Sequence, residues 1–217
     1  MSSKTEPNFL GDGIKWEESN DYSRKVLTVL SGQTLALLAV IGLITVSVPT
    51  TGTAGTNTGN GTCGSVAGKA NTIPETFTLK CTATATNGGT FSVVGSKTGR
   101  LKDASVGVAY DSEYIGFTIA DGTTDFAVGD SFTIAVTAGS GKAVALDPDG
   151  VDGRNHAAGI MVGAVDASTA DNAGVAIVRE AMVAPDYLVW PDSISNDEKA
   201  AAFADLEKLG IVAVTSA

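Results

Sequence analysis

Apolar and polar residues alternate with a period of two through the middle of the chain, which is the pattern of half-buried β-strands. The alternation is clearest in four stretches, "TFTLKCTATA", "TFSVV", "YIGFTIA" and "SFTIAV". The residues expected to point inward are Phe77, Leu79, Cys81, Ala83, Phe91, Val93, Ile115, Phe117, Ile119, Phe132, Ile134 and Val136. Turn signals such as "NGG" at residues 87–89 separate the stretches, so the pattern predicts a small β-sandwich or barrel.

The most apolar run, "VLSGQTLALLAVIGLITVSV" at residues 29–48, raises the question of a membrane span. A spanning helix needs about 20 apolar residues. Here the dense part begins only at Leu35, and Thr45 and Ser47 already dilute it. The run also lies too far from Met1, behind an acidic region, to be a signal peptide, and no targeting sequence is recognisable. It therefore predicts two buried strands, "RKVLTVL" and "LLAVIGLITVSV", joined by the turn "SGQ".

Composition shifts divide the chain into parts. A Gly/Thr/Asn-rich, nearly uncharged segment begins at residue 50, and a similar "TAGSG" ends at residue 141. We therefore expect an inserted all-β domain at residues 50–141 and a core made of residues 9–49 and 142–217. Residues 1–8 lack an apolar period and are expected to form a flexible arm. After the insertion, "KAVAL", "AAGIMVGAVDAS" and "AGVAIVREAMV" predict three more buried strands.

One helix is predicted near the C-terminus. Ser195 and Glu198 have the spacing of a capping box, and Gly210 suits the position after the last turn. Between them, Phe203, Leu206 and Leu209 line one face and Lys208 lies in the last turn. The helix should therefore end at Gly210, and residues 211–214 should form a final strand.

Charge and cysteine content narrow the class of protein. The 217 residues carry a formal net charge of −10, with 43% hydrophobic and 18% charged residues. Such an acidic, globular chain disfavours nonspecific nucleic-acid binding and docking on anionic lipid, so neither partner is expected. Two cysteines cannot form the framework of a disulfide-rich secreted protein. Cys81 is expected to be a buried thiol, whereas the sequence leaves open whether it pairs with Cys63.

A search for catalytic or metal-binding groups gives little. His156 is the only histidine, which excludes a histidine-based metal cluster, and it lies in a polar turn without a nucleophile motif. The acidic turns could in principle collect calcium, but they lack the pattern of an EF-hand loop and suit ordinary turns. Their carboxylates are Asp147, Asp149 and Asp152 in one turn and Asp121, Asp125 and Asp130 around another. We expect no enzyme activity, no cofactor and no metal.

Three segments resemble the lambda-type head decoration proteins of tailed bacteriophages. They are "HAAGIMVGAVDAS", "AIVREAMV" and "YLVWPDSISNDEKAAAFADLEKLGIVAV". The N-terminal "NFLGDGIKWEESNDYSRKVLTVLSGQTL" is similar to the start of longer members. "TATATNGGTFSVV" with "FTIADGTTDFAVGDSFTI" resembles an accessory, Ig-like β-domain that such phage proteins carry as an insertion. The insertion departs from the minimal member, so the family's function transfers only to the flanking core.

The resemblance implies a mainly β protein with a β-clip or barrel-like core and one short C-terminal helix, interrupted by the β-sandwich insertion. It implies a homotrimer that binds the major capsid protein on the outside of the expanded head and stabilises the lattice. The protein would be made in the host cytoplasm and reside on the outer capsid surface. In such proteins an N-terminal arm orders on the capsid. The candidate capsid-binding residues are Ser2, Ser3, Lys4, Thr5, Glu6, Pro7 and Asn8.

Two questions stay open at this level. Trp190, with Pro191 after it, is either packed in the core or an anchor at a trimer or capsid interface. The alternative function is surface adhesion or glycan binding, with a host-surface ligand held by the insertion. That function would need an exposed aromatic platform, for which Tyr110 and Tyr114 are the candidates.

Overall fold

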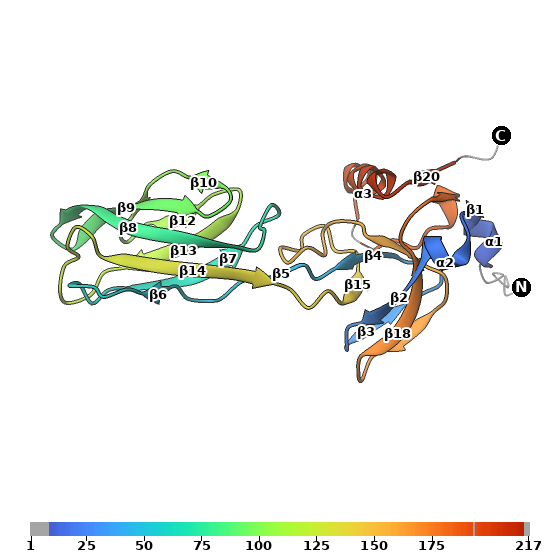
Figure 1. Ribbon diagram of the computed structural model, residues 1–217, viewed down its shortest axis with the longest axis horizontal. Coiled ribbons are helices and arrows are strands. Elements are labelled where there is room, and N and C mark those ends of the chain that lie inside the picture. The colour runs from blue at the N-terminus through green and yellow to red at the C-terminus, as the bar shows by residue number, and fades with distance from the viewer. Residues whose placement is uncertain (1–8, 193, 215–217) are drawn as a thin grey trace, which may run out of the picture. The chain divides into compact units, whose positions relative to one another are not determined.

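The computed structural model describes residues 9–192 and 194–214, and they form two compact units. The first unit combines the chain up to Ile44 with the chain from Gly141 onward, and the second runs from Thr45 to Ser140 (Figure 1). The second unit therefore begins five residues before the predicted boundary at residue 50. That each unit folds independently remains a prediction.

A closed β-barrel lies at the centre of the first unit, with the strand order β15-β2-β18-β16-β4. The five strands are β2 (Arg24–Val29), β4 (Val40–Leu43), β15 (Ala143–Ala145), β16 (Gly159–Met161) and β18 (Asn172–Ile177). The longest pairing is antiparallel, between β18 and β2, from Asn172↔Val29 to Ile177↔Arg24. Aliphatic side chains fill the interior, including Leu27, Val29, Ile41 and Met161, so the barrel is a packed core.

Shorter elements surround the barrel. Strands β3 (Gln33–Leu35) and β17 (Val165–Ala167) form a two-stranded sheet. Strands β1 (Ile14–Glu17), β19 (Ala181–Val183) and β20 (Ile211–Ala213) form a second sheet, in which β19 is central. The helical elements are α1 (Leu10–Gly13), α2 (Asn20–Ser23), the 3₁₀-helix η1 (Pro185–Tyr187) and α3 (Asn196–Lys208). This unit is mainly β with one helix longer than a single turn, as the resemblance implies.

The predicted C-terminal helix is confirmed in its caps and its buried face. The Ser195 hydroxyl accepts the Glu198 amide at 3.3 Å, and the Glu198 carboxylate accepts the Ser195 amide at 2.7 Å. Gly210 adopts φ = 75°, a left-handed conformation that suits glycine after a helix. Leu206 is fully buried, Phe203 and Leu209 are partly buried beside it, and β20 follows as predicted.

The strand expected at residues 37–48 is wrong, because the segment contains β4, β5 (Val46–Ser47) and the turn that precedes β4. Leu38 has φ = 64°, and its side chain is fully buried. Its amide donates to Met161 and its carbonyl accepts from Val189, so tertiary packing holds the bend. The apolar density here serves a folded core, and no helix in residues 9–192 and 194–214 has the length and apolarity to cross a membrane.

Two further predicted strands are each split into two. Residues 157–168 contain β16 and β17, and residues 173–183 contain β18 and β19. The second break falls at Arg179 and Glu180, where Glu180 has φ = 46°. A polar dipeptide in a left-handed turn redirects the chain, so β18 joins the barrel while β19 joins the sheet with β1 and β20.

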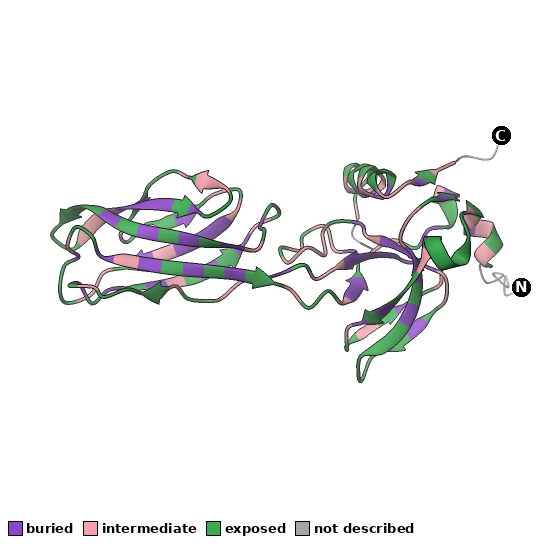
Figure 2. Cartoon of the chain, viewed as in Figure 1, coloured by how far each residue is buried: buried purple, intermediate pink, exposed green. Residues whose placement is uncertain are grey.

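The second unit packs two sheets over one core. One sheet has the order β10-β9-β8-β14-β5, with β11 and β6 paired to it, and the other has the order β12-β13-β7. The bounds are β6 (Thr53–Ala54), β7 (Thr62–Gly68), β8 (Glu75–Ala85), β9 (Gly88–Gly95), β10 (Gly99–Arg100), β11 (Ala104–Ser105), β12 (Ala109–Asp111), β13 (Ile115–Ala120) and β14 (Ser131–Ala138). Buried and exposed residues alternate along β8 and β14 (Figure 2).

The inward-facing residues predicted for this unit are confirmed, with one exception. Ala83 was expected beside Cys81 on the buried face, but it is exposed. The register of β8 against β9 shifts between Cys81 and Ala83. An irregularity of this kind changes which face the following residues occupy, so period-two counting fails beyond it.

Candidate functional site

The lone histidine does not form a catalytic arrangement. His156 is 58% exposed in its side chain, and its Nδ1 lies 3.0 Å from a carboxylate oxygen of Asp205 on α3. The other Asp205 oxygen accepts a hydrogen bond from Lys208 at 2.7 Å. Burial of Asp205 favours a higher pKa, but the hydrogen bonds from Lys208 and His156 outweigh it and lower the pKa. These contacts tie α3 to the loop before β16, as expected of a solvated loop histidine.

The acidic turn after β15 is organised by an arginine. The Asp152 carboxylate accepts hydrogen bonds from Arg154 at 2.7 and 2.8 Å, and the Arg154 contacts lower its pKa against the effect of burial. Asp147 accepts the amide of Asp149 at 3.3 Å within the same turn. Across residues 9–192 and 194–214, no three His, Cys, Asp or Glu side chains are grouped so that they could hold a metal ion.

Asp130 is the structural centre of the other acidic region. It is 4% exposed and accepts the amides of Thr58 and Gly59 at 2.9 Å and of Ala127 at 3.0 Å. Burial alone would raise its pKa, but the three amide donors outweigh burial and lower it. Nearby, Asp125 accepts the amide of Asn87 at 2.9 Å. These carboxylates therefore hold loops together at one end of the second unit.

Both cysteines are free and buried in the second unit. Burial raises the pKa of the Cys63 thiol to about 11. Burial, followed by the charge of Asp130, also raises the pKa of Cys81. A buried thiol with a raised pKa forms little thiolate, so neither cysteine has the character of a reactive nucleophile.

Of the two tyrosines considered for an exposed, ligand-binding aromatic surface on the second unit, one is buried. Tyr110 is 5% exposed, and its ring stacks on Phe117 with the centroids 4.4 Å apart. Its hydroxyl donates to the Lys102 carbonyl at 3.2 Å. Tyr114 is partly buried against the same core. Because inward alternation in β12 buries Tyr110, it does not present a stacking surface to a ligand.

Trp190 lies beside the C-terminal helix. Its ring meets Phe203 of α3 edge to face with the centroids 5.2 Å apart, and the Lys199 ammonium lies 6.0 Å from the ring centroid. Trp190 is partly buried against the core cluster of this helix, and Pro191 follows it at partial exposure. The indole is thus packed against Phe203 while part of the ring meets solvent. The other candidate residues, Ser2 to Asn8, lie outside the described part of the chain.

A row of large apolar side chains crosses the outer face of the β1-β19-β20 sheet. Trp16 pairs in register with Met182, and Met182 pairs with Val212. Their exposed fractions are 48%, 45% and 42%. Neighbouring positions on the same strands, such as Val183 and Ile211, point the other way into the core. We refer to Trp16, Met182 and Val212 as the apolar row.

Three more exposed aromatic residues lie on elements next to β1 and β19 in the chain. Phe9 precedes α1, Tyr187 ends η1, and Tyr22 lies in α2, and all three are exposed. A cation accompanies two of the rings, since Lys15 lies 5.5 Å from the centroid of Tyr187 and Arg179 lies 5.1 Å from that of Tyr22. Among the described residues, no aromatic side chain of the second unit is exposed to this degree.

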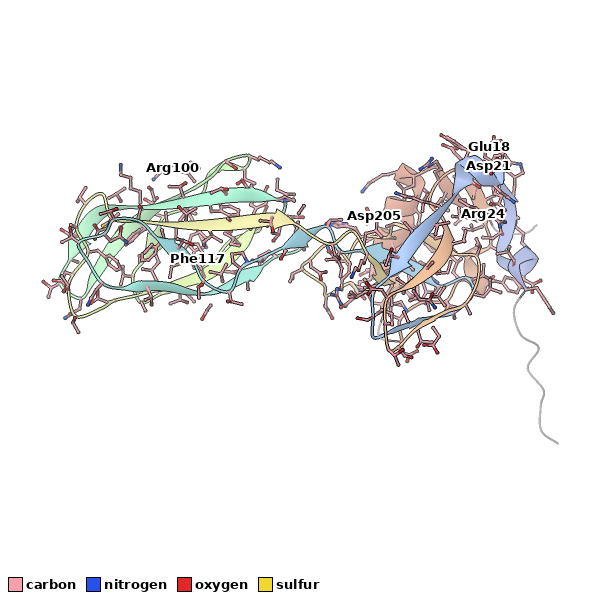
Figure 3. All side chains as sticks on the ribbon, turned by 60° about the horizontal axis from the view of Figure 1, so that its bottom comes forward. Glu18, Asp21, Arg24, Arg100, Phe117 and Asp205 are labelled. Carbon is pink, nitrogen blue, oxygen red and sulfur yellow. The ribbon has the colours of Figure 1, made fainter. Side chains whose placement is uncertain are left out.

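Carboxylates flank the apolar row. Glu18, Asp21, Glu180 and Asp186 are exposed on the connections that flank β1 and β19, and we refer to them as the acidic rim. Figure 3 shows Glu18 and Asp21 together near Arg24. Glu17, next to the rim, differs because it pairs with Arg24 and accepts a 3.0 Å hydrogen bond from the Ser23 hydroxyl. The Arg24 contact lowers the pKa of Glu17 against the opposing effect of burial.

Sequence patterning missed the apolar row for a definable reason. Ile14 and Trp16 are two residues apart, so strict alternation would place both on the buried face. The register of β1 against β19 shifts between them, which leaves Trp16 outside. The available signal was the short apolar triplet "AMV" at residues 181–183, because one residue of a three-residue strand must face away from its neighbours.

Comparisons with known proteins give one family match. The model of the family described as bacteriophage lambda head decoration protein D matches residues 3–211, and no curated protein matches. Two crystal structures of Xanthomonas campestris FlgL, in space groups H3 and C2, align at 20% and 22% identity with TM-scores of 0.31 and 0.32. They cover 51% and 49% of this chain, which spans about a third of FlgL (34% and 33%). Such low TM-scores support no argument.

Proposed function

The chain belongs to the family of bacteriophage lambda head decoration protein D, and from this membership we propose that it binds the outside of the expanded head as a homotrimer and stabilises the capsid lattice. Membership supports a structural, capsid-decorating role. The observation that carries the proposal is the family match, which extends across nearly the whole chain.

The surface of the first unit supports a binding role. Soluble monomers rarely expose contiguous large apolar patches, and such patches commonly mark interaction sites. The apolar row, with Phe9 and Tyr187 on adjoining elements, is a surface of this kind. The same unit carries a second apolar surface, a groove of about 310 Å³ lined in part by Val26 and Val175.

Residues 2–8 are proposed to reach the major capsid protein, by adding a strand to a capsid sheet. Deleting residues 1–8 should leave folding intact, since they precede every described element, and should weaken attachment to heads. The adhesion alternative loses one ring of the aromatic platform that it would need, because Tyr110 is buried.

The proposal is tested by mixing the purified protein with empty heads that lack it, in expanded and unexpanded forms. We expect the protein to sediment with expanded heads in multiples of three copies and to raise their resistance to heat or chelator. Heads that rupture equally with and without bound protein would rule out lattice stabilisation. Absence of sedimentation with either form would rule out capsid attachment.

A further inference from the structure

We propose that the apolar row is the surface by which the folded part of the protein docks on the phage shell, against an apolar patch that is bordered by basic residues. This inference rests on the proposed capsid attachment, and it assigns that attachment to Trp16, Met182 and Val212. It adds a folded docking surface to the contact proposed for residues 2–8.

The first argument is the continuity of the row. The three side chains lie in register across all three strands of one sheet, so they form one surface rather than scattered apolar residues. Tryptophan and methionine are enriched in the buried centres of protein interfaces. Each of the three residues still exposes more than two-fifths of its surface in the isolated chain, which leaves that area to be buried by a partner.

The second argument is the position of the chain ends. Residues 1–8 precede α1 and β1, and residues 215–217 follow β20. Eight residues span at most about 29 Å when fully extended. A shell that binds residues 2–8 must therefore lie within that distance of Phe9, which directly precedes α1 and β1. The second unit, by contrast, is joined to the first unit after β4 and before β15, two strands of the barrel.

The third argument is charge. Around the apolar row, the four carboxylates of the acidic rim outnumber the two cations that accompany the exposed rings, Lys15 and Arg179. The whole chain carries a formal charge of −10, so a symmetric contact between two copies through this face would oppose two acidic rims. A partner surface with lysine or arginine around an apolar centre would complement both features.

The test replaces the apolar row by threonine, which is polar and retains strand propensity. The variant Trp16→Thr/Met182→Thr/Val212→Thr is compared with wild type in binding to expanded empty heads, after sedimentation velocity has established its oligomeric state. We expect the variant to keep the wild-type oligomeric state and to bind heads at least about tenfold more weakly, as for loss of an interface centre.

Two matched variants control for the loss of exposed apolar area. Val94→Thr/Val128→Thr removes exposed valines of the second unit and should bind heads as wild type does. Val26→Thr/Val175→Thr alters the paired valines on the outer wall of the barrel, a rival docking surface. Should this rival variant lose binding while the apolar-row variant binds fully, the barrel wall is the docking surface and the proposal is overturned.

The remaining outcomes are equally decisive. Full binding by the apolar-row variant overturns the proposal. Loss of the oligomeric state in that variant alone makes a second copy the occupant, which also overturns it. If the triple variant does not fold, Met182→Thr alone is measured, because this residue lies at the middle of the row. Failure of the wild-type protein to bind heads would instead reject the proposed function.

Discussion

The two units use their aromatic residues in opposite ways. In the second unit six aromatic side chains are buried in one core, namely Phe77, Phe91, Tyr110, Phe117, Phe126 and Phe132. In the first unit the two fully buried clusters contain only aliphatic, alanine and methionine side chains. Four aromatic residues of that unit, Phe9, Trp16, Tyr22 and Tyr187, are exposed instead.

This difference concerns where each unit places its largest apolar side chains. Aromatic side chains bury the largest apolar areas, and their edge-to-face contacts add to that burial. Phe91 meets Phe126 edge to face at 5.1 Å, so in the second unit this area stabilises the fold itself. In the first unit the barrel is filled by aliphatic residues and methionine, four of the six rings are exposed, and Trp190 and Phe203 pack on each other beside a core cluster. The second unit thus has the composition of a self-contained module.

The largest expected effect comes from deleting a ring in the core of the second unit. Phe91→Ala should lower the free energy of unfolding of that unit by about 3–5 kcal/mol, because Phe91 is fully buried between Phe126 and Phe132. If the units fold independently, calorimetry should show the unfolding transition of the second unit at a lower temperature and that of the first unit unchanged. Binding to expanded heads should be retained, since the apolar row lies in the first unit.

Leu206→Ala is the matched change in the first unit. Leu206 is a fully buried residue of α3, so its truncation should cost about 2–5 kcal/mol and lower the unfolding temperature of the first unit. If either variant lowered the unfolding temperatures of both units, the units would not unfold independently. Replacement of residues 45–140 by a short Gly/Ser linker should also leave a soluble protein that binds heads.

The sequence predicted the second unit better than the first. Strands β8, β9, β13 and β14 are long and alternate regularly, so counting by two found their buried faces. Strands of the first unit have three to six residues, and tertiary contacts set their ends. The bend at Leu38 places a leucine in a left-handed conformation, which no local propensity would predict.

The candidate site was predictable only in part. The capping box of α3 is local, so Ser195 and Glu198 were enough to place that helix. The apolar row depends on a register shift in β1 and on pairing between strands more than 150 residues apart. The burial of Tyr110 likewise depends on the pairing of β12 with β13, which the sequence did not reveal. Counting the period of apolar residues along one strand gives no information on which distant strand pairs with it.

A smaller effect, confined to the second unit, is expected from Asp130→Asn. An amide accepts hydrogen bonds less strongly than a carboxylate, and its NH₂ group would be buried, so the unit should lose about 2–3 kcal/mol. Because the folded-state pKa of Asp130 is lowered, its contribution is present above the unfolded pKa of about 3.9 and is lost as the pH falls toward the folded value. Chemical denaturation between pH 2.5 and 7 should show this acid-dependent loss in wild type and a flatter profile in the variant. Equal slopes would mean that the carboxylate charge does not hold the loops.

The smallest stability change is expected for Trp190→Ala, which addresses the residue that stands between the two uses of aromatic rings. Trp190 packs on Phe203 with one edge while part of its ring is exposed, so truncation should cost the first unit about 1–2 kcal/mol. Phe203→Leu provides the comparison, since it removes the ring contact from the helix side and leaves Trp190 in place. A core role predicts that both variants lower the melting temperature of the first unit and bind heads normally. An interface role predicts that Trp190→Ala alone weakens trimer formation or head binding, with a melting temperature close to that of wild type. If Trp190→Ala leaves stability, oligomeric state and head binding all unchanged, the ring serves neither role.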